Sequence, residues 1–182
     1  MKRLAFGLLA AVLLAVTLPL AGFAETYDLP AGQSDEIKAN VTYTSMNIAG
    51  DLTVSGKTTV TLPTDQKDNV SIPGGTLTVG SGAKVGAAGK NSSNWVLSPD
   101  AATQQYGKIT LNGGTAAMYT FKIAAGGIDA DGYIDILELN GGTFSPYLVQ
   151  NSSSWTGRVS VVASSTVQHG NGYTYGAGTF ST

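Results

Sequence analysis

Residues 72–79 read Ile72-Pro73-Gly74-Gly75-Thr76-Leu77-Thr78-Val79, and this stretch contains both signals that decide the fold. The two glycines permit a tight bend, because glycine adopts positive φ without steric cost. The aliphatic residue before them ends one strand pointing inward, and the threonine after them begins the next. Leucine and valine then alternate with threonines, which is the period of a half-buried strand. The stretch therefore predicts two strands joined by a sharp bend.

The same phrase, an aliphatic residue, any residue, two glycines and a threonine, recurs at Leu111–Thr115 and Leu139–Thr143. A degenerate earlier copy is Ile48–Leu52. The Gly-Gly pairs lie 39 and 28 residues apart, and the degenerate copy precedes the first by about 24. Such spacings overlap those of repeat proteins in which each unit adds strands to a stack. The irregular spacing favours a solenoid whose turns carry loops of different lengths.

Period-two alternation recurs in short runs through the chain after residue 24, and helical stretches are scarce. We therefore predict an all-β domain, a short parallel β-helix (β-solenoid) of five or six turns. A β-sandwich built from hairpins is the alternative, because Asn-Gly and Gly-Gly are also hairpin signals. The predicted inward rows contain Val54, Ile72, Val79, Ile109, Leu111, Ile136, Leu139 and Val161.

The stack also needs covered ends and carries one long loop. Open β-edges invite association, so we expect caps formed by residues 25–45 and by the aromatic tail Tyr173, Tyr175 and Phe180. Residues 89–107 form the longest stretch without strand alternation, and we expect them to make an excursion from the body.

The first 24 residues differ sharply in composition from the rest. Lys2 and Arg3 precede an apolar run from Leu4 to Leu20, and Gly22-Phe23-Ala24 places small residues before Glu25. This order is typical of a secretory signal peptide, although the run is also long enough for an uncleaved transmembrane anchor. We predict a signal peptide at 1–24 and a single exported domain at 25–182, with no membrane span after cleavage and a secreted or cell-surface location.

Composition excludes several classes of protein. The 182 residues include no Cys, so a disulfide scaffold, a thiolate metal site and a Cys nucleophile are ruled out. The net charge is −2 and no block of like charge occurs, so no nucleic-acid partner is expected. Gly89-Lys90 lacks the upstream glycine of a phosphate-binding loop, which argues against a nucleotide.

The run Gly74-Gly75-Thr76-Leu77-Thr78-Val79 resembles the repeats of bacterial autotransporter passengers and related surface β-helix adhesins. The resemblance extends over residues 48–166, and the absence of Cys and the Thr, Ser and Gly richness match it. We expect no membrane barrel like that of an autotransporter, because the region after the repeats is too short, so the resemblance implies a stand-alone secreted solenoid, a truncated relative or a fragment. The resemblance implies a bacterial protein with a right-handed parallel β-helix, used as an adhesin or scaffold and not for catalysis.

A calcium site is predicted in residues 127–138. Compared with an EF-hand loop, Asp129, Asp131 and Asp135 fall at ligand positions 3, 5 and 9, and Gly132 takes the turn at position 6. Gly127 stands where the first ligand is normally Asp, and the flanks read as strands, so a true EF-hand is not expected. The alternative is a turn at Asp131-Gly132 with solvated carboxylates.

Two tryptophans follow similar polar runs, at Asn91-Ser92-Ser93-Asn94-Trp95 and Asn151-Ser152-Ser153-Ser154-Trp155. Exposed aromatic rings flanked by Asn and Ser are suited to stacking on sugars, so Trp95 and Trp155 are candidate glycan contacts. The alternative is that each indole covers the apolar core where a loop returns to it.

Catalytic signals are weak. His169 is the only histidine, and no G-x-S-x-G nucleophile elbow occurs. Stacking could bring Asp129, Asp131 and Asp135 close to Arg158, as a polysaccharide lyase or glycosidase would need, but spacing does not decide this.

We predict a secreted or cell-surface structural or adhesive module that is not an enzyme, whose partner is a host or cell-surface glycan or protein. The alternative is a glycan-binding or polysaccharide-degrading domain on a β-helix or β-sandwich.

Overall fold

The computed structural model describes residues 25–65, 67–87, 89, 91–124, 134–151, 157–161 and 165–167. These residues form fifteen β-strands and no helix, which confirms the predicted all-β class. The predicted signal peptide and the aromatic tail lie outside the described residues.

The strands form two sheets, one of nine strands (sheet A) and one of six (sheet B). Sheet A contains β1 (Glu25–Leu29), β3 (Val41–Ile48), β5 (Thr59–Thr61), β6 (Asp68–Pro73), β8 (Lys84–Gly86), β9 (Asn94–Ser98), β11 (Thr115–Ile123), β13 (Gly142–Asn151) and β15 (Ser165–Val167). Sheet B contains β2 (Ser34–Ile37), β4 (Asp51–Val54), β7 (Thr76–Gly80), β10 (Lys108–Asn112), β12 (Ile134–Leu139) and β14 (Gly157–Val161).

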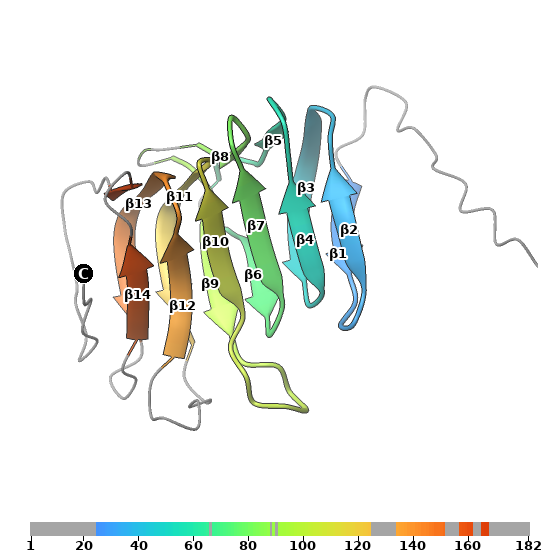
Figure 1. The fold of residues 1–182 in the computed structure, drawn as a ribbon. Coiled ribbons are helices and arrows are strands. Elements are labelled where there is room, and N and C mark those ends of the chain that lie inside the picture. Colours follow the sequence, from blue (N-terminus) through green and yellow to red (C-terminus); the bar gives the residue numbers. More distant parts are fainter. Residues whose placement is uncertain are drawn as a thin grey trace, which may run out of the picture.

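The chain passes from sheet A to sheet B and back, and each pass (a circuit) lies beside the one before it (Figure 1). In the described part, all pairs of neighbouring strands run parallel. A sandwich of hairpins requires antiparallel neighbours, so that alternative is wrong. The antiparallel contacts in this part are two isolated bridges, Gly80–Gly113 and Pro99–Tyr106.

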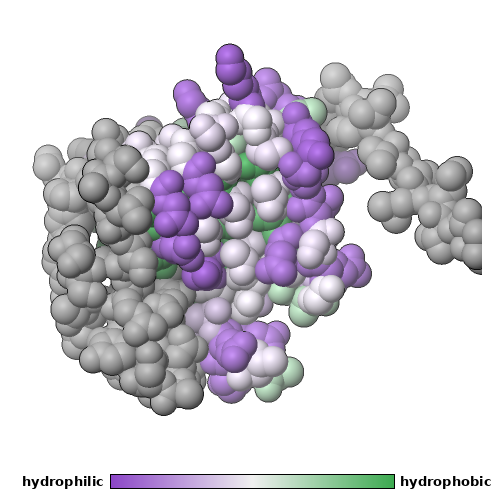
Figure 2. Space-filling view, in the orientation of Figure 1, coloured by the Kyte–Doolittle hydropathy of each residue, from purple (hydrophilic) through white to green (hydrophobic). Residues whose placement is uncertain are grey.

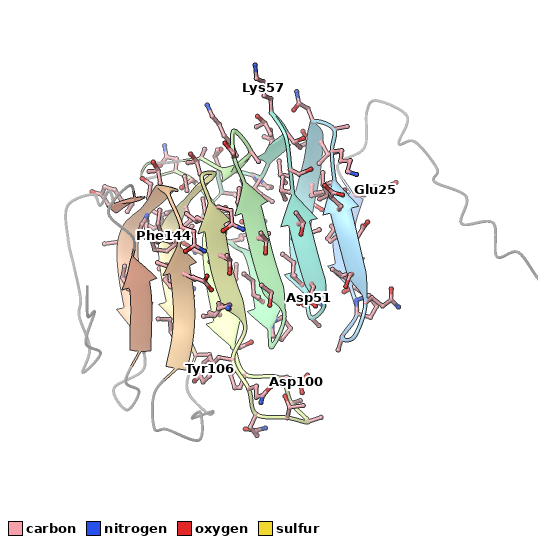
Figure 3. The ribbon with its side chains drawn as sticks, in the orientation of Figure 1. Glu25, Asp51, Lys57, Asp100, Tyr106 and Phe144 are labelled. Carbon is pink, nitrogen blue, oxygen red and sulfur yellow. The ribbon has the colours of Figure 1, made fainter. Side chains whose placement is uncertain are left out.

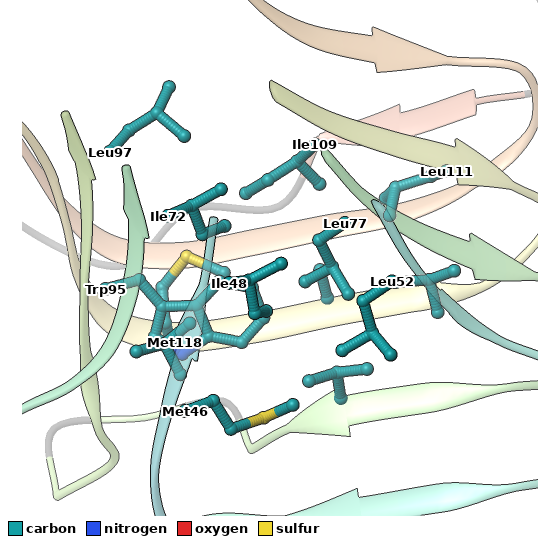
Figure 4. Close-up of a cluster of buried hydrophobic side chains, with 14 of the residues drawn as sticks. Met46, Ile48, Leu52, Ile72, Leu77, Trp95, Leu97, Ile109, Leu111 and Met118 are labelled. Carbon is teal, nitrogen blue, oxygen red and sulfur yellow. The ribbon is translucent and has the colours of Figure 1, made fainter. Parts of the chain in front are cut away.

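The core lies between the sheets, in columns of inward side chains that occupy equivalent positions in successive circuits (Figure 4). In sheet B, one column is Leu52, Leu77, Ile109 and Leu137, and the next is Ile37, Val54, Val79, Leu111 and Leu139. In sheet A, one column is Met46, Val70, Trp95, Phe121 and Val149. Each buried aliphatic side chain contributes roughly 1.5–3 kcal/mol, which offsets the chain entropy without disulfides.

Six of the eight predicted core residues are buried in these columns or beside them: Val54, Ile72, Val79, Ile109, Leu111 and Leu139. The side chains of Ile136 and Val161 lie outside the described part.

The Gly-Gly-Thr phrases lie at two different corners, so the interpretation of one equivalent repeat is wrong. Gly74-Gly75 joins sheet A to sheet B, as the degenerate Gly50 does, whereas Gly113-Gly114 and Gly141-Gly142 join sheet B to sheet A. The 39 residues between Gly74-Gly75 and Gly113-Gly114 therefore span one full circuit and, in addition, the sheet B strand β10. This difference accounts for the irregular spacing in the sequence.

The corner glycines stack in two columns where backbones of successive circuits approach closely. One column is Gly50, Gly75 and Gly107, and the other is Gly80, Gly114 and Gly142. A Cβ at residue 75 would lie 2.5 Å from the carbonyl oxygen of Gly50, and that oxygen accepts a hydrogen bond from the Thr76 amide at 3.0 Å. A side chain there would displace the backbone hydrogen bonds between circuits.

The first circuit differs from the others at its inward positions. Asp35 pairs in register with Leu52, so a carboxylate occupies the end of an otherwise apolar column. It accepts a hydrogen bond from the Tyr27 hydroxyl at 2.8 Å, and the ring of Tyr27 packs on Tyr43 with centroids 5.2 Å apart. An inward charge at the end of a sheet opposes edge-to-edge association. Asp35 and Tyr27 lie within residues 25–45, for which the sequence predicts a cap, and that role stays a prediction.

We expect Gly75→Ala to destabilise the fold more than Gly56→Ala. The Gly75 change forces a methyl group against backbone atoms, a clash of the kind that costs about 3 kcal/mol. Gly56 has a φ of +66° but open space for a Cβ, so alanine there meets only the cost of about 1 kcal/mol for a left-handed residue. Urea unfolding of both variants measures the difference; equal midpoints would contradict the close-approach explanation.

We also expect stability to fall at alkaline pH. Burial raises the pKa of Tyr27 above its usual value of about 10, and the hydrogen bond and charge of Asp35 raise it further. Because the folded state favours the neutral phenol, its contribution is present below about pH 10 and is lost as the pH rises beyond that value. Urea unfolding between about pH 8.5 and pH 11.5, which is about 1.5 units either side of the tyrosine value, measures the loss.

The control for this prediction is Tyr27→Phe, which removes the titrating hydroxyl. Its alkaline loss should be smaller but not zero, because burial also raises the pKa of Tyr43. An identical alkaline loss in the wild type and in this variant would contradict the assignment to Tyr27.

Candidate functional site

The outer side of sheet B is an ordered polar surface. Its outward residues alternate with the buried columns, so Thr53, Thr78, Thr110 and Glu138 follow one another in register across four strands. Neighbouring strands lie about 4.8 Å apart, which sets the step between these side chains. We define the polar face as Glu36, Asp51, Thr53, Ser55, Thr76, Thr78, Lys108, Thr110, Asn112, Glu138 and Asn140. Figure 2 looks onto this side of the molecule: pale residues of intermediate hydropathy occupy the middle, and hydrophilic residues lie on both sides of them.

Four side chains of the polar face form a hydrogen-bonded network, the amide cluster (Lys108, Asn112, Glu138 and Asn140). The Asn140 amide donates to Asn112 Oδ1 at 3.1 Å and to Glu138 Oε1 at 2.7 Å. Lys108 Nζ donates to Glu138 Oε2 at 3.1 Å. The register that pairs Leu111 with Leu139 places the two asparagines side by side on β10 and β12. The cluster is therefore built from two circuits 28 residues apart.

Two ion pairs compensate the charges of the glutamates on this face. The side chains of Lys108 and Glu138 are 37% and 38% exposed, so their ion pair is partly shielded from water. At the other end of the face, Glu36 accepts from Ser55 Oγ at 2.5 Å and pairs with Lys38 Nζ at 2.7 Å. The hydrogen bond from Lys38 is the main cause that lowers the pKa of Glu36 below its ordinary value, and the hydrogen bond from Ser55 is the second. Glu36 thus stays ionised at physiological pH, and each of the two glutamates is neutralised by a lysine.

One loop projects from the stack, between β9 and β10 (Figure 3). Asp100 Oδ1 accepts hydrogen bonds from the Thr103 amide at 2.7 Å and from the Thr103 hydroxyl and the Ala102 amide at 3.0 Å each. These bonds lower the pKa of Asp100 and fix the loop as a turn. The Tyr106 hydroxyl donates to the carbonyl of Ala124 and anchors the returning strand. The excursion predicted for residues 89–107 is shorter, because residues 94–98 form β9.

Trp95 does not lie on the surface. Its side chain is 0% exposed, between Val70 and Phe121 in the sheet A column, and its Nε1 donates to Ser93 Oγ at 3.1 Å. A ring in this position has no face open to a sugar, so the glycan-contact prediction for Trp95 is wrong in this structure. The serine that made the sequence look surface-exposed instead satisfies the buried indole N–H. Trp155 lies outside the described residues.

The predicted calcium ligands Asp129 and Asp131 also lie outside the described residues, as does His169. Asp135 belongs to β12, where its backbone pairs in register with that of Arg158 on β14. The topology thus places the acid and the base named in the sequence on neighbouring strands. Among the described residues, no three His, Cys, Asp or Glu side chains gather closely enough to hold a metal ion.

The sequence analysis missed the amide cluster, although a signal for it was present. Asn precedes the Gly-Gly pair in the second and third copies of the phrase, at Asn112 and Asn140, but not in the first copy. These two copies occupy the same corner, so their asparagines meet. Lys108 and Glu138 could not be found in this way, because their contact depends on the register of β10 and β12.

Comparison with known proteins gives no relative. No family model matches the chain, and no significant match to it occurs among the curated proteins or the solved structures. Within the part of the chain that the structure describes, no helix is long and apolar enough to cross a membrane. Function is therefore inferred from the arrangement of the residues themselves.

We expect Trp95→Ala to lower the free energy of unfolding by about 3–5 kcal/mol, as is usual when a large buried aromatic side chain is removed. Val96→Ala is the matched control, because Val96 is the next residue on the same strand and is only partly buried. Urea unfolding measures both. A Trp95→Ala variant as stable as the control would contradict the buried position of the indole.

Proposed function

We propose that the chain is a right-handed parallel β-solenoid of about six turns that is exported to the cell surface or the medium and acts there as a structural or adhesive module. The parallel pairing of successive circuits supports the solenoid. The right hand is supported by the general preference of crossovers between parallel strands. Export is supported by the signal-peptide pattern of residues 1–24, and a bacterial source by the resemblance to surface adhesin repeats.

The observation that carries the adhesive function is that rigid circuits hold a preorganised polar surface. Buried columns fix each strand of sheet B, and the side chains of the polar face bond to one another across circuits. The projecting loop is likewise fixed by Asp100 and Tyr106. A scaffold that positions surface groups in this way is suited to recognition, because little side-chain freedom is lost on binding.

An enzyme on the same scaffold is the weaker proposal. A glycosidase requires two carboxyl groups facing one bond, roughly 5–9.5 Å apart. Glu138 instead accepts hydrogen bonds from the Lys108 amine and the Asn140 amide, which is the arrangement of a structural ion pair. Calcium binding by Asp129, Asp131 and Asp135 remains a prediction, and it would show as a thermal shift at millimolar calcium.

We expect beads coated with the exported protein to adhere to cultured epithelial or bacterial cells. The same protein should release no new reducing ends or unsaturated products from a panel of polysaccharides. Beads coated with thermally unfolded protein serve as the control, because adhesion through a rigid surface requires the folded chain. Adhesion no greater than in that control, or sustained product release, would contradict the proposed function.

A further inference from the structure

The amide cluster is more ordered than exposed side chains need to be for solubility. Asn112 and Asn140 are both exposed, yet each is held by the other, and Glu138 joins Asn140 to Lys108. Long polar side chains that are already fixed in the free protein lose little conformational entropy when they bind a ligand. This is the condition under which weak hydrogen bonds from a surface add up to useful affinity.

The atoms that the cluster presents have a definite chemistry. The contact between the asparagines uses Asn112 Oδ1 and Asn140 Nδ2, which leaves Asn112 Nδ2 as a donor and Asn140 Oδ1 as an acceptor on the exposed side. Lys108 has further N–H donors, whereas Thr110, the next outward residue along β10, is buried. Donors and acceptors therefore alternate over a few ångströms, which suits adjacent hydroxyl groups that both donate and accept.

The charge and composition of this surface restrict the class of ligand further. Lys108 is neutralised by Glu138, so the cluster has no net charge with which to attract a polyanion or a polycation. Thr53 and Thr78 lie side by side in register and are both partly exposed, so their methyl groups offer a small apolar area. Protein interfaces are enriched in aromatic residues and depleted in Lys, Glu and Ser, which is the opposite of this surface.

We propose that the amide cluster, together with Thr53 and Thr78, is a binding site for a neutral glycan whose chain runs across the strands of sheet B. The in-register row of Thr53 and Thr78 repeats hydroxyl groups in that direction at the strand spacing. A sugar unit on the cluster forms the hydrogen bonds, and the following units lie on the threonine row. This inference rests on the proposed adhesive function and names its ligand class.

Affinity electrophoresis in gels containing a neutral glucan, galactan or mannan tests the site, with polygalacturonate as the acidic counterpart. We expect at least one neutral polymer to retard the wild-type protein. The double variant Asn112→Ala/Asn140→Ala should weaken that binding about tenfold, equivalent to about 1.4 kcal/mol. Its melting temperature and far-UV circular dichroism show whether it remains folded.

Asn47→Ala is the matched control, because Asn47 is another exposed asparagine that bonds to the preceding circuit, to Asp28 Oδ1 at 2.7 Å on sheet A. It should bind the neutral polymer like the wild type. Glu138→Gln keeps the shape of the cluster and leaves Lys108 uncompensated, so it should gain retention on polygalacturonate. This second variant tests the role of charge balance even if the double variant does not fold.

Three results would overturn the inference. The first is that no neutral polymer retards the wild-type protein, and the second is that a folded double variant is retarded as strongly as the wild type. The third is that polygalacturonate retains the wild type more strongly than every neutral polymer does. The cell-adhesion experiment separates this failure from that of the proposed function. Adhesion without neutral-glycan retention would reject the glycan site alone, and loss of both would reject the adhesive function as well.

Discussion

Close approach of backbones at the corners is the constraint on which the rest of this structure depends. At Gly75 and Gly114 a carbonyl oxygen of the previous circuit lies only 2.5 Å from where a Cβ would be. The amide of the next residue donates a hydrogen bond to that same circuit. Because a larger residue would separate the circuits, the glycines fix their spacing. Parallel strands then pair in register between the corners, and each side chain meets its equivalent one circuit away.

This repetition explains how the chain is stable without disulfides and with few charges. Columns such as Leu52, Leu77, Ile109 and Leu137 bury the same kind of residue at every level, so the core grows by one layer with each circuit. The column ends where Asp35 replaces the aliphatic residue and bonds to Tyr27 at the solvent-exposed first circuit. The low charge of the sequence corresponds to an outer surface of hydroxyl and amide groups.

Local patterns in the sequence were sufficient to predict the strands, and contacts between circuits were not. Leu77 and Val79 alternate with threonines because one side of the strand is buried, and this is visible within a few residues. Whether two Gly-Gly pairs lie at the same corner depends on the length of the intervening loops, so Gly74-Gly75 was wrongly equated with Gly113-Gly114. Trp95 was misjudged for a related reason: its neighbour Ser93 looks like a surface residue but bonds to the indole inside the core.

The same distinction determines where function can lie in this fold. Inward positions are committed to stacking, and corner positions to close approach, so variation without loss of the stack is confined to the outer faces and the loops. A contact such as Asn112–Asn140 uses the register that the core enforces, so no separate backbone adjustment is needed to form it. An exposed pair held in this way is more rigid than two isolated side chains. The regularity that stabilises the interior thus also orders the surface, and it supplies the preorganisation that recognition of a polar ligand requires.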